Sequence, residues 1–352
     1  MQALKASSTA HCGSGASRKP RRSSSCSTPR PAWPPAPCCC VPRAQSNGDA
    51  RGVSWAAPWP RHGGHTRRGG GARSSGGAAA PATQPQQPQQ QQPQPQPPEG
   101  LRLEQMPRHV AIIMDGNSRW AQAHGWATRD GHEAGVTALR RSVEAAARWG
   151  VRALTVFAFS EENHGRPAAE VAFLFALFGR ALEEQLPELH ARGVRLRFIG
   201  GLQRLPPALR ATIARAEALT EANPGLLLTV AVSYGARTDI AAAARALAEA
   251  VAAGRLRPEE ITPAALEARL STADALAAAG PVDLCIRTSG TQRLSNFLLF
   301  EMAYAELYFD PDLWPAFGEA NFERALRAYA ASERRFGGRM MSGGGGSGAA
   351  AR

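Results

Sequence analysis

Four short runs of polar and charged residues have the composition of a site for phosphate and metal. The first run, Met114-Asp115-Gly116-Asn117-Ser118-Arg119-Trp120, combines a carboxylate, a glycine, an amide and a guanidinium. Asp115 could hold Mg2+, while Asn117, Arg119 and backbone N–H groups at a following helix start could receive phosphate oxygens. A capped structural turn would use the same residue types, so this run alone leaves both readings open.

The second and third runs carry arginines beside small polar residues. Residues 159–167 offer Ser160, Asn163 and Arg166, and turn capping explains the first two more readily than the arginine. Residues 286–297 contain Arg287 and Arg293, six residues apart around a Ser/Gly turn. Because guanidinium forks bind phosphate oxygens in pairs, this spacing suits a terminal diphosphate.

The fourth run, residues 303–307, places Glu306 between apolar residues as a candidate second metal ligand. The runs stand next to short apolar segments that alternate with longer segments of helical period, a pattern typical of α/β layering. The expected strands are His109–Ile113, Ala153–Phe159, Val194–Ile199, Leu226–Ser233, Asp283–Ile286 and Ala305–Phe309. The expected helices are His132–Trp149, Ala168–Arg192, Pro207–Ala222, Thr238–Ala253, Pro263–Leu270 and Phe317–Arg335.

These elements predict a single α/β domain with a largely parallel six-stranded sheet flanked by helices. In such an open sheet, ligands bind beyond the carboxyl ends of the strands, where we expect the polar runs to gather. The first strand is not followed by Gly-x-Gly-x-x-Gly, and a body without lysine has no phosphate loop of the Gly-Lys-Ser/Thr type. His-Glu-x-x-His and Gly-x-Ser-x-Gly are also absent, which removes the commonest metalloprotease and hydrolase readings.

The expected helix from Ala168 carries an unusually wide apolar stripe. Val171, Leu174, Phe175 and Phe178 follow helical spacing, and this much is ordinary core. The extra width could line an apolar tunnel, where each buried CH2 of a ligand contributes about 0.8 kcal/mol. A phosphate-binding rim above an apolar tunnel would suit an amphiphilic substrate.

Charge and composition divide the 352-residue chain near residue 100. The first 100 residues hold 12 of the 41 basic and two of the 29 acidic residues, which leaves 29 arginines against 27 acidic residues in the body. A nearly neutral body gives no support for nucleic-acid binding. The Ser- and Arg-rich start has a transit-peptide composition, and the Gln/Pro tract at 84–98 is typical of a spacer. We therefore expect a disordered leader over 1–100, a catalytic domain over 101–339 and a disordered Gly/Ala-rich tail over 340–352.

Five of the six cysteines lie in the leader, so the body is not a disulfide scaffold. An uninterrupted apolar stretch of about 18 residues is also missing, which excludes a transmembrane helix. The leader has the composition of an organelle transit peptide, which plastid and mitochondrial leaders share.

Taken together, the body resembles the cis-prenyltransferase (undecaprenyl diphosphate synthase) family from about Pro107 to Arg339. The resemblance is carried by His109-Val-Ala-Ile-Ile-Met-Asp-Gly-Asn-x-Arg-Trp-Ala, Gly131-His-Glu-Ala-Gly, Phe159-Ser-x-Glu-Asn, Asp283-Leu-x-Ile-Arg-Thr-Ser-Gly, Arg293-Leu-Ser-Asn-Phe-Leu-Leu, Ala303-Tyr-Ala-Glu-Leu and Glu333-Arg-Arg-Phe-Gly-Gly-Arg. It implies a homodimeric, Mg2+-dependent enzyme that adds isopentenyl diphosphate to an allylic diphosphate, each new double bond being cis. With the leader, the chain looks like a plant or algal plastid member.

The resemblance also implies roles for individual residues. Asp115 would bind Mg2+ and the allylic diphosphate, and Glu306 would help to bind the metal. Asp115, Asn117, Ser160 and Asn163 would act in catalysis. The residues that would bind substrate are Gly116, Arg119, Trp120, His132, Arg166, Arg287, Arg293 and Ser295.

The chain departs from the family pattern at several motif positions. His164 replaces the usual Trp after Glu-Asn, Thr291 replaces a Glu, and Gln292 stands where bacterial members often have a metal-binding His. Lesser departures are Phe300 for Trp, Ser118 for Gly and Thr128 for Arg. Because Asp115, Arg287, Arg293 and Glu306 are intact, we expect an active enzyme with an altered rate or product length.

Two other readings compete with this one. A non-catalytic accessory subunit of a two-component prenyltransferase would generally lack the Asp motif and carry a membrane segment, the reverse of this chain. An RNA-binding protein recruited by the basic leader would have to keep its binding after loss of residues 1–100. Product length and allylic primer stay open, although the small Ala158 leaves room in the tunnel.

Overall fold

Six apolar runs pair into one parallel sheet in the computed structural model, which describes residues 94–332. The strand order is β3-β4-β2-β1-β5-β6, and every neighbouring pair runs parallel. The strands are β1 (His109–Ile113), β2 (Ala153–Ser160), β3 (Arg195–Ile199), β4 (Leu227–Tyr234), β5 (Leu284–Arg287) and β6 (Glu306–Phe309). This confirms the expected single α/β domain for the described residues.

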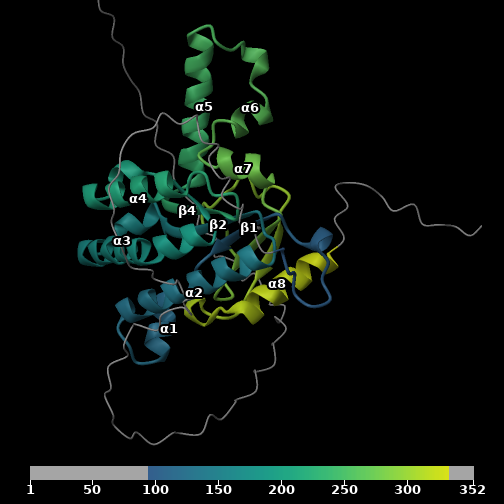
Figure 1. The fold of residues 1–352 in the computed structure, drawn as a ribbon. Helices are drawn as coiled ribbons and strands as arrows, with labels where there is room; N and C mark the ends of the chain where they lie inside the picture. The colour runs from purple at the N-terminus through teal and green to yellow at the C-terminus, as the bar shows by residue number, and fades with distance from the viewer. Residues whose placement is uncertain (1–93, 333–352) are drawn as a thin grey trace, which may run out of the picture. The chain divides into compact units, whose positions relative to one another are not determined.

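Helices connect the strands and cover the sheet. They are α1 (Asn117–Ala123), α2 (Thr128–Arg148), α3 (Ala168–Ala191), α4 (Pro207–Thr220), α5 (Ala236–Ala252), α6 (Pro263–Glu267), α7 (Ala273–Ala279) and α8 (Glu319–Ala331). Short 3-10 turns include η2 (Glu162–Gly165) and η3 (Leu202–Arg204), which follow β2 and β3. Figure 1 shows α2, α3, α4 and α8 packed around the sheet, whereas α5 and α6 project away from it.

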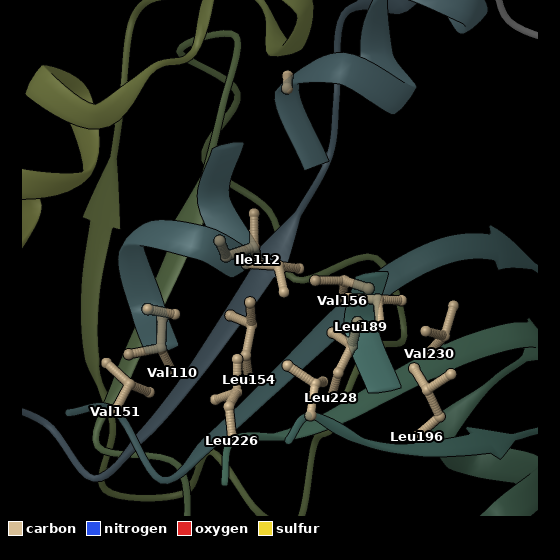
Figure 2. Packing of buried hydrophobic residues seen from close by; sticks show 14 of the residues in the cluster. Val110, Ile112, Val151, Leu154, Val156, Leu189, Leu196, Leu226, Leu228 and Val230 are labelled. Carbon is tan, nitrogen blue, oxygen red and sulfur yellow. The ribbon is translucent and has the colours of Figure 1, made fainter. Parts of the chain in front are cut away.

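The core forms because each central strand is apolar on both faces. Val110 and Ile112 of β1 join the larger buried cluster, while Ala111 and Ile113 join a second cluster across the sheet. This alternation is the two-residue period of a strand, and full burial on both sides is typical of a parallel sheet. Figure 2 shows side chains from several strands meeting in the larger cluster.

The structure corrects several expected boundaries. The helix expected from His132 begins at Thr128, α1 is the helix start expected after Asp115 but not given a range, and α7 was not expected. Folded packing begins before residue 100, since the Gln96 N–H donates to the Arg148 carbonyl and Pro98 is buried. The leader up to residue 93, the closing motif from Glu333 and the tail over 340–352 lie outside the described residues.

The sheet order places the polar runs on adjacent strands. β1 lies between β2 and β5, so the segments after residues 113, 160 and 287 leave the same edge side by side. The chain passes from β1 to β2 on one side and from β5 to β6 on the other, which creates a switch point between β1 and β5. Ligands of open α/β sheets bind in the crevice at such a point. Among the described helices, none has the length and apolarity needed to cross a membrane.

Candidate active site

An ion pair between Asp115 and Arg287 occupies the switch point. Asp115 follows β1, Arg287 ends β5, and Arg287 Nη2 donates to Asp115 Oδ2 at 2.9 Å. On the other side of the carboxylate, Arg119 Nη2 donates to Asp115 Oδ1 at 3.0 Å. The sequence candidates for metal and diphosphate binding therefore meet at the strand ends, where the polar runs were expected to gather, because β1 and β5 are neighbours in the sheet.

The carboxylate of Asp115 is held in its ionised form. Partial burial raises the pKa of Asp115, but the hydrogen bond from Arg287 and the positive charges of Arg287 and Arg119 lower it by more. The pKa of Asp115 consequently lies below its ordinary value. At neutral pH, the site presents a permanent anion between two permanent cations.

The backbone around Asp115 is fixed by the loop that follows β5. Thr288 Oγ1 accepts from the Asp115 N–H at 2.9 Å and donates to the Asp115 carbonyl at 2.7 Å. Arg119 Nη2 also donates to Ser289 Oγ at 2.7 Å. Thr288 and Ser289 were not singled out from the sequence, although their place between the strand end and the second arginine is a signal that could have found them.

Gly116 lets the chain turn sharply after Asp115. Its φ of 115° is in the region that favours glycine, and an added Cβ would lie 2.8 Å from Leu313 Cδ2. The glycine is therefore required by backbone geometry and by the close approach of Leu313. This gives a structural reason for a residue that the sequence assigned to substrate binding.

Arg287 also organises the second half of its own loop. Its Nη1 donates to Ser295 Oγ at 2.8 Å and to the Arg293 carbonyl. Ser289, Ser295, Asn296 and Leu298 all adopt positive φ values, which is uncommon outside glycine. Such conformations persist where surrounding contacts over-determine them and cluster at ligand-binding sites. The Arg293 side chain is exposed, whereas its backbone carbonyl accepts the hydrogen bond from Arg287.

The turn after β2 is closed by two reciprocal hydrogen bonds. The Ser160 N–H donates to Asn163 Oδ1 at 3.1 Å, and the Asn163 N–H donates to Ser160 Oγ at 3.3 Å. Asn296, another residue missed from the sequence, donates from Nδ2 to Glu162 Oε1 at 3.1 Å and joins this turn to the β5 loop. The two polar runs are thus physically connected.

An apolar cavity of about 110 Å³ is lined in part by Met114 and Asn117, which flank Asp115 and Gly116 in the chain. Its wall comes from the ends of β1, β2 and β4, from α2 and α3, and from Trp314. The wide apolar stripe of α3 contributes Leu174, Phe175, Leu177 and Phe178, as the expected tunnel required. Ala158 lies in the wall, where its small side chain leaves space.

Two buried polar atoms in this cavity wall have no hydrogen-bond partner: Asn117 Oδ1 and His132 Nε2. An orphaned buried polar atom is costly, so its presence at a cavity calls for a bound ligand. Burial, and next the charge of Arg166, lowers the pKa of His132 and favours the neutral ring, with Glu170 acting in the opposite direction. Arg166 itself pairs with Glu170 at 3.3 Å.

Glu306 is not brought to this group within one chain. It is the first residue of β6 and pairs in register with Leu284, three residues before Arg287. At about 3.3 Å per residue, it lies some 10 Å back along the sheet from the strand end. Trp120 is also directed to other contacts, since its ring packs on His124 and Trp126 at centroid distances of 4.2 and 5.2 Å.

The residues at the switch point fit a magnesium ion bound together with a diphosphate. Within residues 94–332, no group of three His, Cys, Asp or Glu side chains is arranged to hold a metal by itself. Mg2+ commonly uses one or two carboxylates, several waters and substrate phosphate oxygens. The ionised Asp115 supplies a suitable oxygen ligand, and the adjacent arginines supply positive charge for the diphosphate.

Comparisons with known proteins agree with this site. Residues 113–337 match the family model described as "Putative undecaprenyl diphosphate synthase". A ditrans,polycis-undecaprenyl-diphosphate synthase ((2E,6E)-farnesyl-diphosphate specific) of Pectobacterium atrosepticum is 53% identical over 66% of this chain and 90% of the relative. A protein of the same description from Salmonella paratyphi A is 52% identical over the same shares of the two chains.

A solved structure extends the similarity to the fold. The lavandulyl diphosphate synthase of Lavandula x intermedia, in complex with dimethylallyl diphosphate, has a TM-score of 0.65 and 39% identity, covering 66% of this chain and 99% of the other. With the family model matching more than half of the residues, the chain belongs to the undecaprenyl diphosphate synthase family of prenyltransferases.

Proposed function

We propose that this enzyme extends an allylic diphosphate by cis addition of isopentenyl diphosphate, with Mg2+ as cofactor. One observation carries the proposal: a carboxylate lies between two guanidinium groups, and the residues that flank it in the chain, Met114 and Asn117, line an apolar cavity. A prenyl diphosphate has the same two parts, an anionic head and an apolar chain. The names of the most similar bacterial proteins, which specify farnesyl diphosphate, support this substrate class.

Different residues of the chain would bind the two diphosphates. Asp115 would hold Mg2+ against the allylic diphosphate, and Mg2+ when bound would neutralise charge on the leaving group. Arg119 stays close enough to stabilise the same anion. Arg287, Arg293 and Ser295 share the β5 loop and would bind isopentenyl diphosphate, since Arg287 already holds Ser295 in place.

The condensation then proceeds inside a site shaped by the chain. The allylic C–O bond breaks to give an allylic cation and diphosphate, the isopentenyl double bond attacks this cation, and the new cation loses one proton to an oxygen of the released diphosphate as the double bond forms. Asn163 uses Oδ1 to accept from Ser160, which leaves its amide N–H groups available to the reacting diphosphate. The growing chain enters the cavity between α2 and α3, where burial of each CH2 is favourable.

We propose further that the enzyme is a homodimer built on the β6 edge. β6 is an edge strand with one unpaired side, and Tyr304, Leu307 and Leu299 near it are 82%, 45% and 38% exposed. An exposed apolar edge of this kind is a template for pairing with another chain. Leu307→Lys should give a monomer in light scattering after size exclusion, whereas Leu219→Lys, at a similarly exposed leucine on α4, should leave the dimer intact.

A dimer would also account for the position of Glu306. We propose that Glu306 serves the metal of the second protomer, because within its own chain it lies at the opposite end of the sheet from Asp115. Mixing inactive Asp115→Ala and Glu306→Ala chains should then restore activity through mixed dimers. If the mixture stays inactive while mixed dimers form, Glu306 does not act across the interface.

The alternative of a non-catalytic accessory subunit is not favoured. The Asp115 motif is intact and held ionised by Arg287 and Arg119, and the cavity retains unpartnered polar atoms. A scaffold without chemistry has no need of either feature.

The decisive experiment uses the full chain with labelled isopentenyl diphosphate, Mg2+ and each of four allylic primers, from C5 to C20. We expect labelled polyprenyl products with wild type and with Glu259→Ala, an exposed carboxylate of a separate turn. Asp115→Ala should abolish these products although circular dichroism shows that the variant, less stable without its partner for Arg287, is still folded at the assay temperature. If the folded wild type extends none of the four primers, the proposed activity is wrong.

Import into a plastid is proposed from the composition of residues 1–100, of which residues 1–93 lie outside the described part of the chain. The Ser- and Arg-rich, acid-poor start supports this proposal. A fusion of residues 1–100 to a fluorescent protein should co-localise with plastids in plant cells. Co-localisation with mitochondria would show that the plastid proposal is wrong and that the leader directs import into mitochondria.

A further inference from the structure

The turn that carries Ser160 and Asn163 is tied to the rest of the molecule at a few points. The Glu161 N–H donates to the Tyr234 carbonyl at 3.0 Å, and Glu161 Oε2 accepts from Thr238 at 2.7 Å. Glu162 is bonded to Asn296, as described above. The remaining polar tether is a 2.9 Å hydrogen bond between His164 Nε2 and Ser233 Oγ.

The His164 tether differs from the others because it ends in the core. Ser233 belongs to β4, is fully buried and has a φ of 52°, so its hydroxyl group is held by a rigid and unusual backbone. Glu161 and Glu162, by contrast, bond to Thr238 and Asn296 in contacts that are exposed to solvent. Within residues 94–332, His164 therefore gives the turn a side-chain anchor in β4, in addition to the bond between Asn163 and the end of β2.

The His164 ring also touches the wall of the apolar cavity. It packs edge-on against Phe159 at a centroid distance of 5.0 Å and against Phe175 at 6.0 Å. Both phenyl rings line the cavity. The ring thus bridges the polar turn, the sheet and the surface that would receive the prenyl chain.

We propose that His164 is a positioning residue, whose bond to Ser233 holds Asn163 in register with the mouth of the cavity. The inference rests on the proposed prenyl transfer, in which the diphosphate at the turn and the chain in the cavity belong to one substrate. A small displacement of the turn relative to the cavity would misalign the reacting carbon, and misplacement by about 1 Å can lower a rate by roughly 100-fold. His164 itself has no contact with the Asp115–Arg287 pair and needs none for this role.

The burial of His164 and the charged groups around it favour the neutral form of its ring. Burial, and then the positive charge of Arg204 on η3, lowers its pKa, while Glu161 in the same turn acts in the opposite direction. β2, β4 and α3 face the ring with Phe159, Ser233 and Phe175, which carry no charge. Protonation would occur as the pH falls below the ordinary value of about 6.5, and would place a cation beside Arg204.

The test is a double-mutant cycle on the full chain, with His164→Phe and Ser233→Ala. Phenylalanine keeps a ring against Phe159 and Phe175 but removes the hydrogen bond. We expect each single variant to lower kcat roughly tenfold, with KM for both substrates changed less than about threefold. The double variant should be no slower than His164→Phe, because the same bond is removed only once.

Two further variants separate positioning from general loss of structure. His164→Gln keeps a group that can bond to Ser233 and should recover most of kcat. It should also flatten the kcat profile below about pH 6.5, the ordinary value of histidine, because glutamine does not titrate. His190→Phe, at an exposed histidine near the end of α3, serves as the control and should match wild type.

Each result decides the inference. Multiplicative effects of the two single variants, or an unchanged kcat in His164→Phe, would overturn it. A kcat loss that follows the unfolding temperature in all variants, glutamine included, would assign His164 to stability alone and also overturn it. An inactive wild type would instead refute the proposed prenyl transfer, and this outcome is visible in the same assay.

Discussion

The ion pair between Asp115 and Arg287 should stabilise the domain as well as build the site. Its geometry is favourable: the atoms are 2.9 Å apart, and the side chains of Arg287 and Asp115 are 6% and 29% exposed. A hydrogen bond to a charged group contributes about 1.5–3 kcal/mol to folding. Because Asp115 keeps Arg119 as a second partner, we expect a coupling energy of about 2 kcal/mol at pH 7.

The measurement is a double-mutant cycle of urea unfolding with Asp115→Asn, Arg287→Met and the double variant. Arg197 and Asp274 provide a matched control, since their 2.6 Å pair is more exposed, with side chains 24% and 56% accessible. Exposed pairs typically contribute at most about 1 kcal/mol. The control cycle with Arg197→Met and Asp274→Asn should therefore give less than half of the coupling at the switch point.

The pH dependence of the cycle tests the electrostatic explanation. The pKa of Asp115 is depressed in the folded chain, so its stabilising contribution is fully present above about pH 4, the unfolded value. It is lost as the pH falls through the lower folded value. We expect equal couplings at pH 7 and pH 5, and a smaller coupling at pH 3. A coupling at pH 7 no larger than that of the control pair, or one that does not change at pH 3, would refute the reasoning.

Three shorter predictions concern the cavity and the metal. Gly135→Ala places a Cβ 2.5 Å from Asn117 Oδ1 and should destabilise the fold by about 1–3 kcal/mol in urea unfolding, whereas Gly318→Ala, whose Cβ meets nothing within 4 Å, should not. Ala158→Phe fills part of the cavity and should shorten the products resolved by chromatography, while an unchanged product ladder would place the growing chain elsewhere. Chelation with EDTA should abolish prenyl transfer and excess Mg2+ should restore it; activity that survives chelation would contradict the proposed role of Asp115.

The strands were predictable because their signal is local. Short apolar runs that are rich in β-branched residues and bounded by polar ones favour core strands, and β1 and β4 are buried along their whole length. The bounds of α1 and the existence of α7 escaped prediction for a physical reason. The Asn117–Ala123 segment buries only Ala121, and the Ala273–Ala279 segment is too rich in alanine to show a period.

The site was predictable only in part, because residue type is local and proximity is not. Asp115 and Arg287 could be placed at the same edge of the sheet in advance, since both stand at strand ends, but their ion pair required the order of the strands. The distance of Glu306 from the other site residues could not be predicted, because it depends on the register of β6 against β5, which the sequence of β6 does not specify. The orphaned Asn117 Oδ1 and the anchor between His164 and Ser233 depend on side-chain packing, for which the sequence carries no periodic signal.

The neighbouring positions of β1 and β5 have a consequence for how the protein is made. Asp115 and Arg287 are 172 residues apart in the chain, so their contact has a very high contact order. During synthesis, β1 and β2 leave the ribosome long before β5 exists, and the β5 side of β1 stays unpaired in the meantime. Such open edges make nascent domains prone to aggregation and dependent on chaperones. The Asp115–Arg287 pair therefore forms late, and translation products that end before β5 lack Arg287 altogether.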